Sequence, residues 1–206
     1  SMGLTVLLWG PRDERPDENG VRPRDSQCGL FATGKVLRRY QVPFTYLRNF
    51  RLEDAAFERG VRDFLAVCNI VKTFRSIRIL QLGPRPYDFL STMCNEGELL
   101  ERFNIQLAPI PLPELCEEVR SAPQAEVDAV AARCRSEMNI AVPDEALRTI
   151  AALKTAIALL AAKYLCKAVA LQCWNALQQE LGIMPCAANA LLNKDSLPTV
   201  CETDIH

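Results

Sequence analysis

The chain lacks the short motifs that indicate the commonest cofactor sites. It contains no G-x-G-x-x-G and no G-x-x-x-x-G-K-[ST] segment, so neither a dinucleotide site nor an NTP-binding loop is indicated. Its nine cysteines include no C-x-x-C pair, which leaves a zinc knuckle and a thioredoxin-type motif without support. The single histidine is His206, and Ser-His-Asp catalysis has no support either.

Long blocks of one charge sign are also missing. Lys and Arg number 24 against 25 Asp and Glu, so neither nucleic acid nor an anionic membrane surface is an expected partner. The most apolar segment, residues 150–169, is interrupted by three lysines, which favours a buried helix over a membrane span. The N-terminus has no basic and apolar leader pattern, and the scattered cysteines favour a reducing cytoplasm over secretion.

Apolar runs alternate with segments of helical period, and both are interrupted by turn residues. The strands predicted from these runs cover residues 4–9, 43–47, 77–82, 105–110, 183–187 and 198–201. The predicted helices cover residues 26–40, 54 to beyond 71, 87–103, 124–138 and 144–182, the last one bent or divided. This order predicts an α/β fold with a Rossmann-like, doubly wound, mainly parallel sheet of about five to six strands flanked by helices. We expect a single domain over residues 1–206.

Two loops follow predicted strands on the side of the sheet where such folds bind ligands. Gly83-Pro84-Arg85-Pro86 closes one strand and opens a helix, although a stiff turn explains it equally well and is the commoner reason for such a segment. Trp9-Gly10-Pro11 leaves its strand on the same side, which makes a shared crevice with the first loop an open alternative. The charged stretch 11–24 is predicted to be an exposed loop.

The last residues carry the best candidates for chemistry. Glu202 and Asp204 are two apart, so on a continued strand both side chains face the same way. Oxygen ligands of this type suit Mn²⁺ or Mg²⁺, and the plainer alternative is a solvated strand end. Gln172 and Asn175 share one face of a predicted helix while Trp174 points elsewhere, and a core tryptophan between solvated amides explains that pattern too.

Several of these segments resemble those of the L-fucose isomerase and L-arabinose isomerase family. The most specific are residues 168–174 (AVALQCW), 182–188 (GIMPCAA) and 200–205 (VCETDI). Residues 82–86 and 95–103 resemble the middle region of the same family, and the likeness covers nearly the whole chain but is diffuse before Ile77. The resemblance implies an aldose–ketose isomerase with bound Mn²⁺, built from two Rossmann-like domains and a C-terminal β-rich domain and assembled as a homo-oligomer. It implies that this chain is the second, central domain and that N- and C-terminal domains are missing from it.

The resemblance also implies roles for particular residues. Glu202 matches the family's metal-binding glutamate at the reacting centre, and Asp204 matches the acidic residue two positions beyond it. Gln172, with Trp174 beside it, is a candidate for contact with the sugar substrate. The family's other metal-binding carboxylate and histidine lie beyond His206, so we expect this cytoplasmic chain to be inactive alone. Two alternatives stay open, namely a sugar-binding module that lost the chemistry and a domain whose role is subunit packing.

Overall fold

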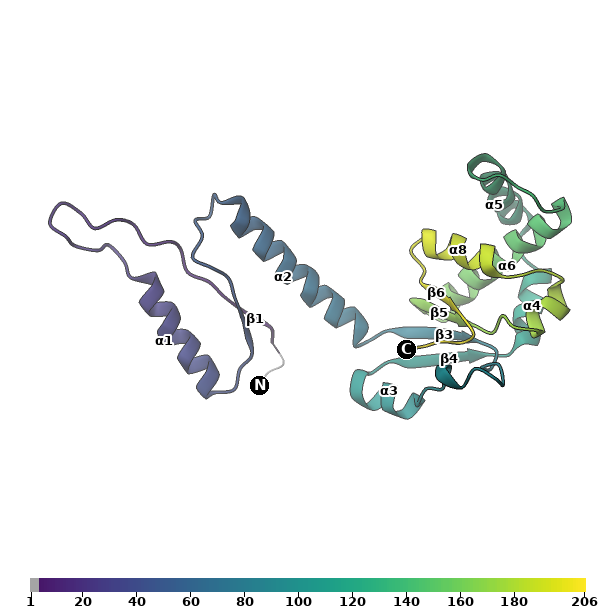
Figure 1. Ribbon diagram of the computed structural model, residues 1–206, viewed down its shortest axis with the longest axis horizontal. Helices are drawn as coiled ribbons and strands as arrows, with labels where there is room; N and C mark the ends of the chain where they lie inside the picture. Colours follow the sequence, from purple (N-terminus) through teal and green to yellow (C-terminus); the bar gives the residue numbers. More distant parts are fainter. Residues whose placement is uncertain (1–3) are drawn as a thin grey trace. The chain divides into compact units, whose positions relative to one another are not determined.

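The computed structural model describes residues 4–206 and divides into two compact units (Figure 1). The first unit ends at Thr73, and the second runs from Phe74 to His206. The α/β class is confirmed, because the described residues form six strands and eight α-helices, and all strand pairs are parallel. The strands lie in a two-stranded and a four-stranded sheet rather than in one sheet of five to six. The sequence analysis predicts one domain over residues 1–206 and does not predict the division into two units after Thr73.

The first unit is a small parallel pair of strands with two helices. Strand β1 (Val6–Leu8) pairs with β2 (Phe44–Tyr46), and the chain between them forms α1 (Ser26–Arg39). Helix α1 comes close to the strands at Gly34, where an added Cβ would lie 3.5 Å from the Phe44 ring and 3.6 Å from Leu8. The second helix is α2 (Ala55–Phe74), which belongs to this unit up to Thr73. The sequence predicts all four elements to within a few residues.

The second unit is built on a four-stranded parallel sheet of order β4-β3-β5-β6. Its strands are β3 (Arg78–Leu82), β4 (Gln106–Ile110), β5 (Ala168–Leu171) and β6 (Thr199–Cys201). At the carboxyl edge Leu171 of β5 lies opposite Leu82 of β3 on one side and Cys201 of β6 on the other. The ends of these three strands are therefore held next to one another.

The helix predicted over residues 144–182 is interrupted by strand β5, which the prediction lacks. The helix observed there is α6 (Asp144–Lys163), which ends before Leu165 adopts a left-handed backbone with φ 56°. The chain then forms β5 and, after a loop, the short helix α7 (Ala176–Leu181). The four residues AVAL of β5 continue the helical period of α6, and a short apolar run cannot be assigned to strand or helix by period alone.

Three further differences concern helices. The strand predicted at 183–187 is wrong, because Cys186 begins helix α8 (Cys186–Lys194) directly after Pro185. The helix predicted over 87–103 is a 3-10 turn, η1 (Leu90–Thr92), followed by α3 (Glu96–Phe103). Helix α4 (Leu112–Arg120) is absent from the prediction, whereas α5 (Gln124–Glu137) agrees with it.

Helix α6 is the centre of the core of the second unit. It buries nine residues, among them Leu153, Ile157 and Leu160, which pack in one cluster with Leu80 and Leu82 of β3. Burial of one such side chain stabilises a fold by about 1.5–3 kcal/mol. This core fixes the strand ends on which the candidate site is built. None of the helices in the described part of the chain has the length and hydropathy needed to cross a bilayer.

Candidate functional site

The candidate site lies at the carboxyl edge of the four-stranded sheet. Parallel strands bring the residues that follow them to the same edge, which is where open α/β sheets bind ligands. Backbone hydrogen bonds extend the strand pairing into these loops: Gln172 N donates to Leu82 O at 2.8 Å, and Thr203 N donates to Leu171 O at 3.3 Å. The loops after β3, β5 and β6 therefore meet there.

Glu202 follows β6 directly and is half-buried. Its Oε1 accepts a hydrogen bond from the Cys173 thiol at 2.7 Å, and its Oε2 accepts one from Trp174 N at 3.4 Å. Glu202 and Thr203 both have left-handed backbone, with φ 58° and 53°. Such conformations in residues other than glycine cost free energy and persist where the surroundings hold them, often at functional sites. The turn presents the carboxylate to the loop that follows β5.

Cys173 supplies the buried side of this contact. Burial is the main cause that raises the pKa of its thiol, and the neighbouring Glu202 carboxylate raises it further, so the thiol stays protonated and can donate. Cys201 completes a small cluster, because the two Sγ atoms and a carboxylate oxygen of Glu202 all lie within 4.8 Å of one another. The amide of buried Asn189 in α8 donates to Cys201 Sγ at 3.1 Å. Neither Cys173 nor Asn189 is a candidate in the sequence analysis.

The side chain of Asp204 does not face the same way as that of Glu202, contrary to the expectation from a continued strand. The chain turns at Glu202 and Thr203 instead of continuing as a strand, so the two-residue alternation does not apply there. Asp204 is exposed, and its Oδ1 lies 3.5 Å from His206 Nδ1. It is not part of the cluster formed by Cys173, Cys201 and Glu202.

Gln172 and Trp174 line one pocket, although they lie in the loop after β5 and not on a helix. The cavity volume is about 270 Å³, and the segment Pro86–Phe89 forms its other wall. The Trp174 ring is half-exposed and meets Phe89 edge to face, with ring centroids 5.4 Å apart. Gln172 Oε1 is buried without a hydrogen-bond partner among the described residues. The loop that begins at Gly83 thus contributes to a pocket, whereas Trp9 belongs to the first unit.

The cluster of Cys173, Cys201 and Glu202 could supply one ligand of the kind that a bound Mn²⁺ ion prefers. Mn²⁺ prefers oxygen ligands, and the cluster offers one carboxylate, from Glu202, and two thiols, which suit softer ions. Among the described residues, Glu202 is therefore the member of the cluster that fits such an ion.

Comparison with known proteins supports the resemblance found in the sequence. Residues 1–75 match the family described as fucose/sulfoquinovose isomerase, N-terminal domain. The chain is 28% identical over 202 residues to the sulfoquinovose isomerases of Priestia aryabhattai and Priestia megaterium, which covers 98% of this chain and 45% of each relative. The sulfoquinovose isomerase of Alkalicoccus urumqiensis is 24% identical over 204 residues, with the same coverage.

The chain is thus similar to proteins of the fucose isomerase-like family. The family resemblance described in the sequence analysis is thereby confirmed. The chain spans about half the length of the curated relatives it matches. The family that matches residues 1–75 describes an N-terminal domain, so the assignment of the chain to a central domain stays a prediction.

Proposed function

We propose that this chain is part of a metal-dependent aldose–ketose isomerase and that Glu202 supplies one carboxylate to its metal site. The observation that carries the proposal is the Glu202 carboxylate, oriented by Cys173 and by the backbone of Trp174 at the carboxyl edge of the sheet. The sulfoquinovose isomerases that align with 98% of the chain support the reaction class. The four-stranded parallel sheet supports the further proposal of a Rossmann-like, doubly wound domain.

The chemistry explains why a fixed carboxylate matters. Aldose–ketose isomerisation moves a proton between two adjacent carbons while negative charge develops on their oxygens. A bound divalent cation, Mn²⁺ in our proposal, polarises those oxygens. Glu202 would hold the cation, and the hydrogen bonds from Cys173 and Trp174 N would fix the direction of its carboxylate oxygens. Further oxygen ligands are needed, which is why we expect little turnover from this chain alone.

Gln172 and Trp174 are our candidates for sugar contact. A half-exposed indole offers an apolar face beside polar groups, and the pocket that it lines also contains the Gln172 and Asn175 side chains. The names of the relatives indicate sulfoquinovose as one sugar to test, together with L-fucose and L-arabinose.

We place the protein in the cytoplasm, as a homo-oligomer that includes further domains.

The test is an isomerase assay of the full gene product with added Mn²⁺ and each of the three sugars. Incorporation of deuterium from D₂O into the sugar, followed by NMR, reports the proton transfer directly. We expect Glu202→Gln to lower turnover at least about 100-fold, because a metal ligand and its charge are lost. Asp204→Asn is the matched control, since it removes an exposed carboxylate outside the cluster. Undiminished turnover in Glu202→Gln would remove this residue from the mechanism.

The second candidate is a sugar-binding module without catalysis, which the single oxygen ligand in the cluster favours. The same assay separates the two. Sugar binding that depends on Trp174, detected by quenching of its fluorescence, combined with no deuterium incorporation in the full gene product, would support the module and contradict the isomerase.

A further inference from the structure

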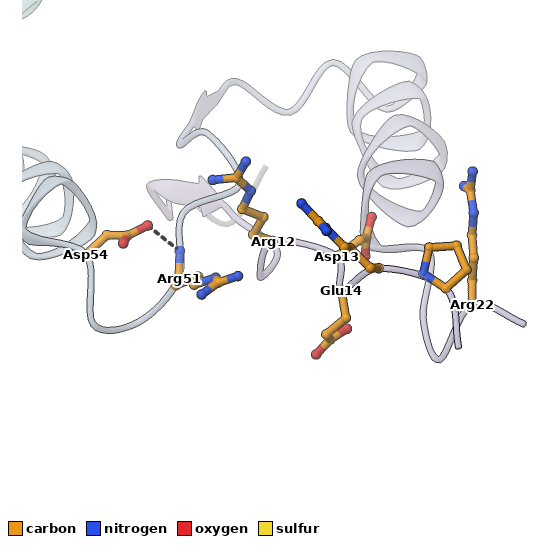
Figure 2. A pocket seen from close by; sticks show the side chains of 8 residues that line it. Arg12, Asp13, Glu14, Arg22, Arg51 and Asp54 are labelled. Carbon is orange, nitrogen blue, oxygen red and sulfur yellow. Dashed lines mark hydrogen bonds between the residues drawn. The ribbon is translucent and has the colours of Figure 1, made fainter. Parts of the chain in front are cut away.

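The first unit contains a pocket lined by arginines that the proposed isomerase site does not use. Its cavity volume is about 550 Å³, and Arg12, Arg15, Arg22 and Arg51 contribute to its lining. All four side chains are exposed, and none of the four guanidinium groups makes an ion pair or hydrogen bond with another residue in the described part of the chain. Figure 2 shows Arg51 and Asp54 toward one end of the pocket and Arg22 at the other.

Three carboxylates share the pocket, but each already has another partner. Asp13 accepts hydrogen bonds from Ser26 N at 2.7 Å and from Gln27 N at 3.3 Å, at the start of α1. These bonds to backbone N–H groups are consistent with the lowered pKa of Asp13, of which the bond from Ser26 N is the largest cause.

The other two carboxylates also have partners, one a backbone N–H group and one an arginine side chain. Asp54, which precedes α2, accepts a hydrogen bond from Arg51 N at 2.8 Å, the dashed line in Figure 2. Glu14 pairs with Arg24 at 2.6 Å, and Arg24 is not among the residues that line the pocket. The Asp13 carboxylate is therefore directed at the start of α1, the Asp54 carboxylate at the backbone N–H of Arg51, and the Glu14 carboxylate at an arginine outside the pocket, while the four guanidinium groups keep their donors.

We infer that this pocket binds a small organic molecule through a tetrahedral oxyanion, a sulfonate or a phosphate ester. Guanidinium groups donate in a planar fork that matches such oxygens, and they remain charged at every relevant pH. Several forks around one cavity offer more donors than the two oxygens of a carboxylate accept, which favours a group with three terminal oxygens. The volume exceeds that of an inorganic ion, so the oxyanion is expected to be carried by an organic molecule.

The test is a titration of the 206-residue chain at constant ionic strength, followed by the ¹H–¹⁵N resonances of the arginine Nε–H groups. Glucose 6-phosphate and ethanesulfonate are the two oxyanion probes, and acetate and glucose are the controls. We expect saturable shifts with at least one oxyanion probe and binding at least about tenfold weaker for acetate. The tighter of the two probes identifies the class of the oxyanion.

Arg12→Gln and Arg51→Gln should each weaken that binding at least about tenfold, because each removes a charge-assisted contact. Arg62→Gln is the matched control, since it removes the same charge from an exposed pair with Glu58 in α2 and should change the affinity less than twofold. Shifts that do not saturate, or equal weakening by all three variants, would overturn the inference. Circular dichroism confirms that each variant is folded, and Arg22→Gln replaces any variant that is not. Because Glu202 takes no part, the outcome is independent of the proposed isomerase activity.

Discussion

The Cys173 thiol lies 2.7 Å from Oε1 of Glu202, and this hydrogen bond joins the loops that follow β5 and β6. One partner is a buried neutral donor and the other a half-buried carboxylate. Because burial and the carboxylate both raise the pKa of the thiol, the contact persists over the pH range in which most enzymes work. The pKa of the Cys173 thiol is therefore sensitive to the charge on Glu202.

Removing the charge of Glu202 should make Cys173 more reactive. In Glu202→Gln the pKa of the thiol falls toward its ordinary value, because a neutral amide no longer opposes the thiolate. We expect alkylation of Cys173 by iodoacetamide at pH 8.5 to accelerate several-fold, measured by peptide mass spectrometry. Cys166 is the internal control, since burial is the main cause of its raised pKa and Glu202 is not among the causes. An unchanged rate at Cys173 in the folded variant would contradict the electrostatic coupling.

The same raised pKa predicts a loss of stability at alkaline pH. Above the ordinary thiol pKa of 9.0 the unfolded chain releases the proton of Cys173 while the folded chain keeps it. The free energy of unfolding should therefore fall as pH rises through 9 and beyond, by at most about 1.4 kcal/mol per pH unit for this group. Urea denaturation of wild type and Cys173→Ala at pH 8 and pH 10 measures the difference in slope. Replacement of the exposed Cys186 by alanine should leave the slope unchanged.

The sequence predicts those parts of the fold that local residues specify. Strands β3 and β6 are identifiable because Gly83-Pro84 ends the first and acidic residues follow the second. Strand β5 is not, because the break after α6 depends on a left-handed Leu165 rather than on glycine or proline. Its burial between β3 and β6 comes from tertiary pairing that a single sequence does not display.

In the candidate site, too, some residues can be predicted from the sequence, and others depend on tertiary pairing. Glu202, Gln172 and Trp174 are identifiable from residue type and family resemblance, and the structure brings Trp174 N to Glu202 and Gln172 to the adjoining pocket. Cys173 is missed because a cysteine among apolar residues is read as a small hydrophobic side chain. Only the pairing of β5 with β6 reveals that its thiol meets a carboxylate.

Gly83 should be intolerant of any side chain. Its φ is +79°, and an added Cβ would lie 2.6 Å from Gln172 Oε1 and 2.9 Å from Leu112 Cγ. We expect Gly83→Ala to lower the free energy of unfolding by about 2–4 kcal/mol, from backbone strain together with the clash. Gly182→Ala is the matched control, because Gly182 has φ +66° with nothing within 4 Å of an added Cβ. Equal losses in urea denaturation would show that the close approach to Gln172 contributes nothing.

Asp195, directly after α8, should make the second unit sensitive to acid. Its Oδ1 lies 2.8 Å from Arg133 of α5 and its Oδ2 lies 2.8 Å from Lys154 of α6, so one carboxylate connects three helices. The hydrogen bond from Lys154 is the largest cause that lowers the pKa of Asp195. The stabilisation is therefore present above the ordinary value of 3.8 and is lost as pH falls below it through the pKa of the folded state.

Asp195→Asn tests this linkage. At pH 7 the variant should lose about 1–2 kcal/mol in urea denaturation, because the largely buried Lys154 keeps its charge without a carboxylate. Between pH 5 and pH 3 the variant should lose less stability than wild type, since the titrating group is gone. Asp128→Asn is the control, because Asp128 forms an exposed pair with Arg148 and such pairs contribute about 0–1 kcal/mol. The contradicting result would be an equal loss of unfolding free energy at pH 7 in both variants, with the same change between pH 5 and pH 3. In that case the contacts of Asp195 with Arg133 and Lys154 would not stabilise the second unit.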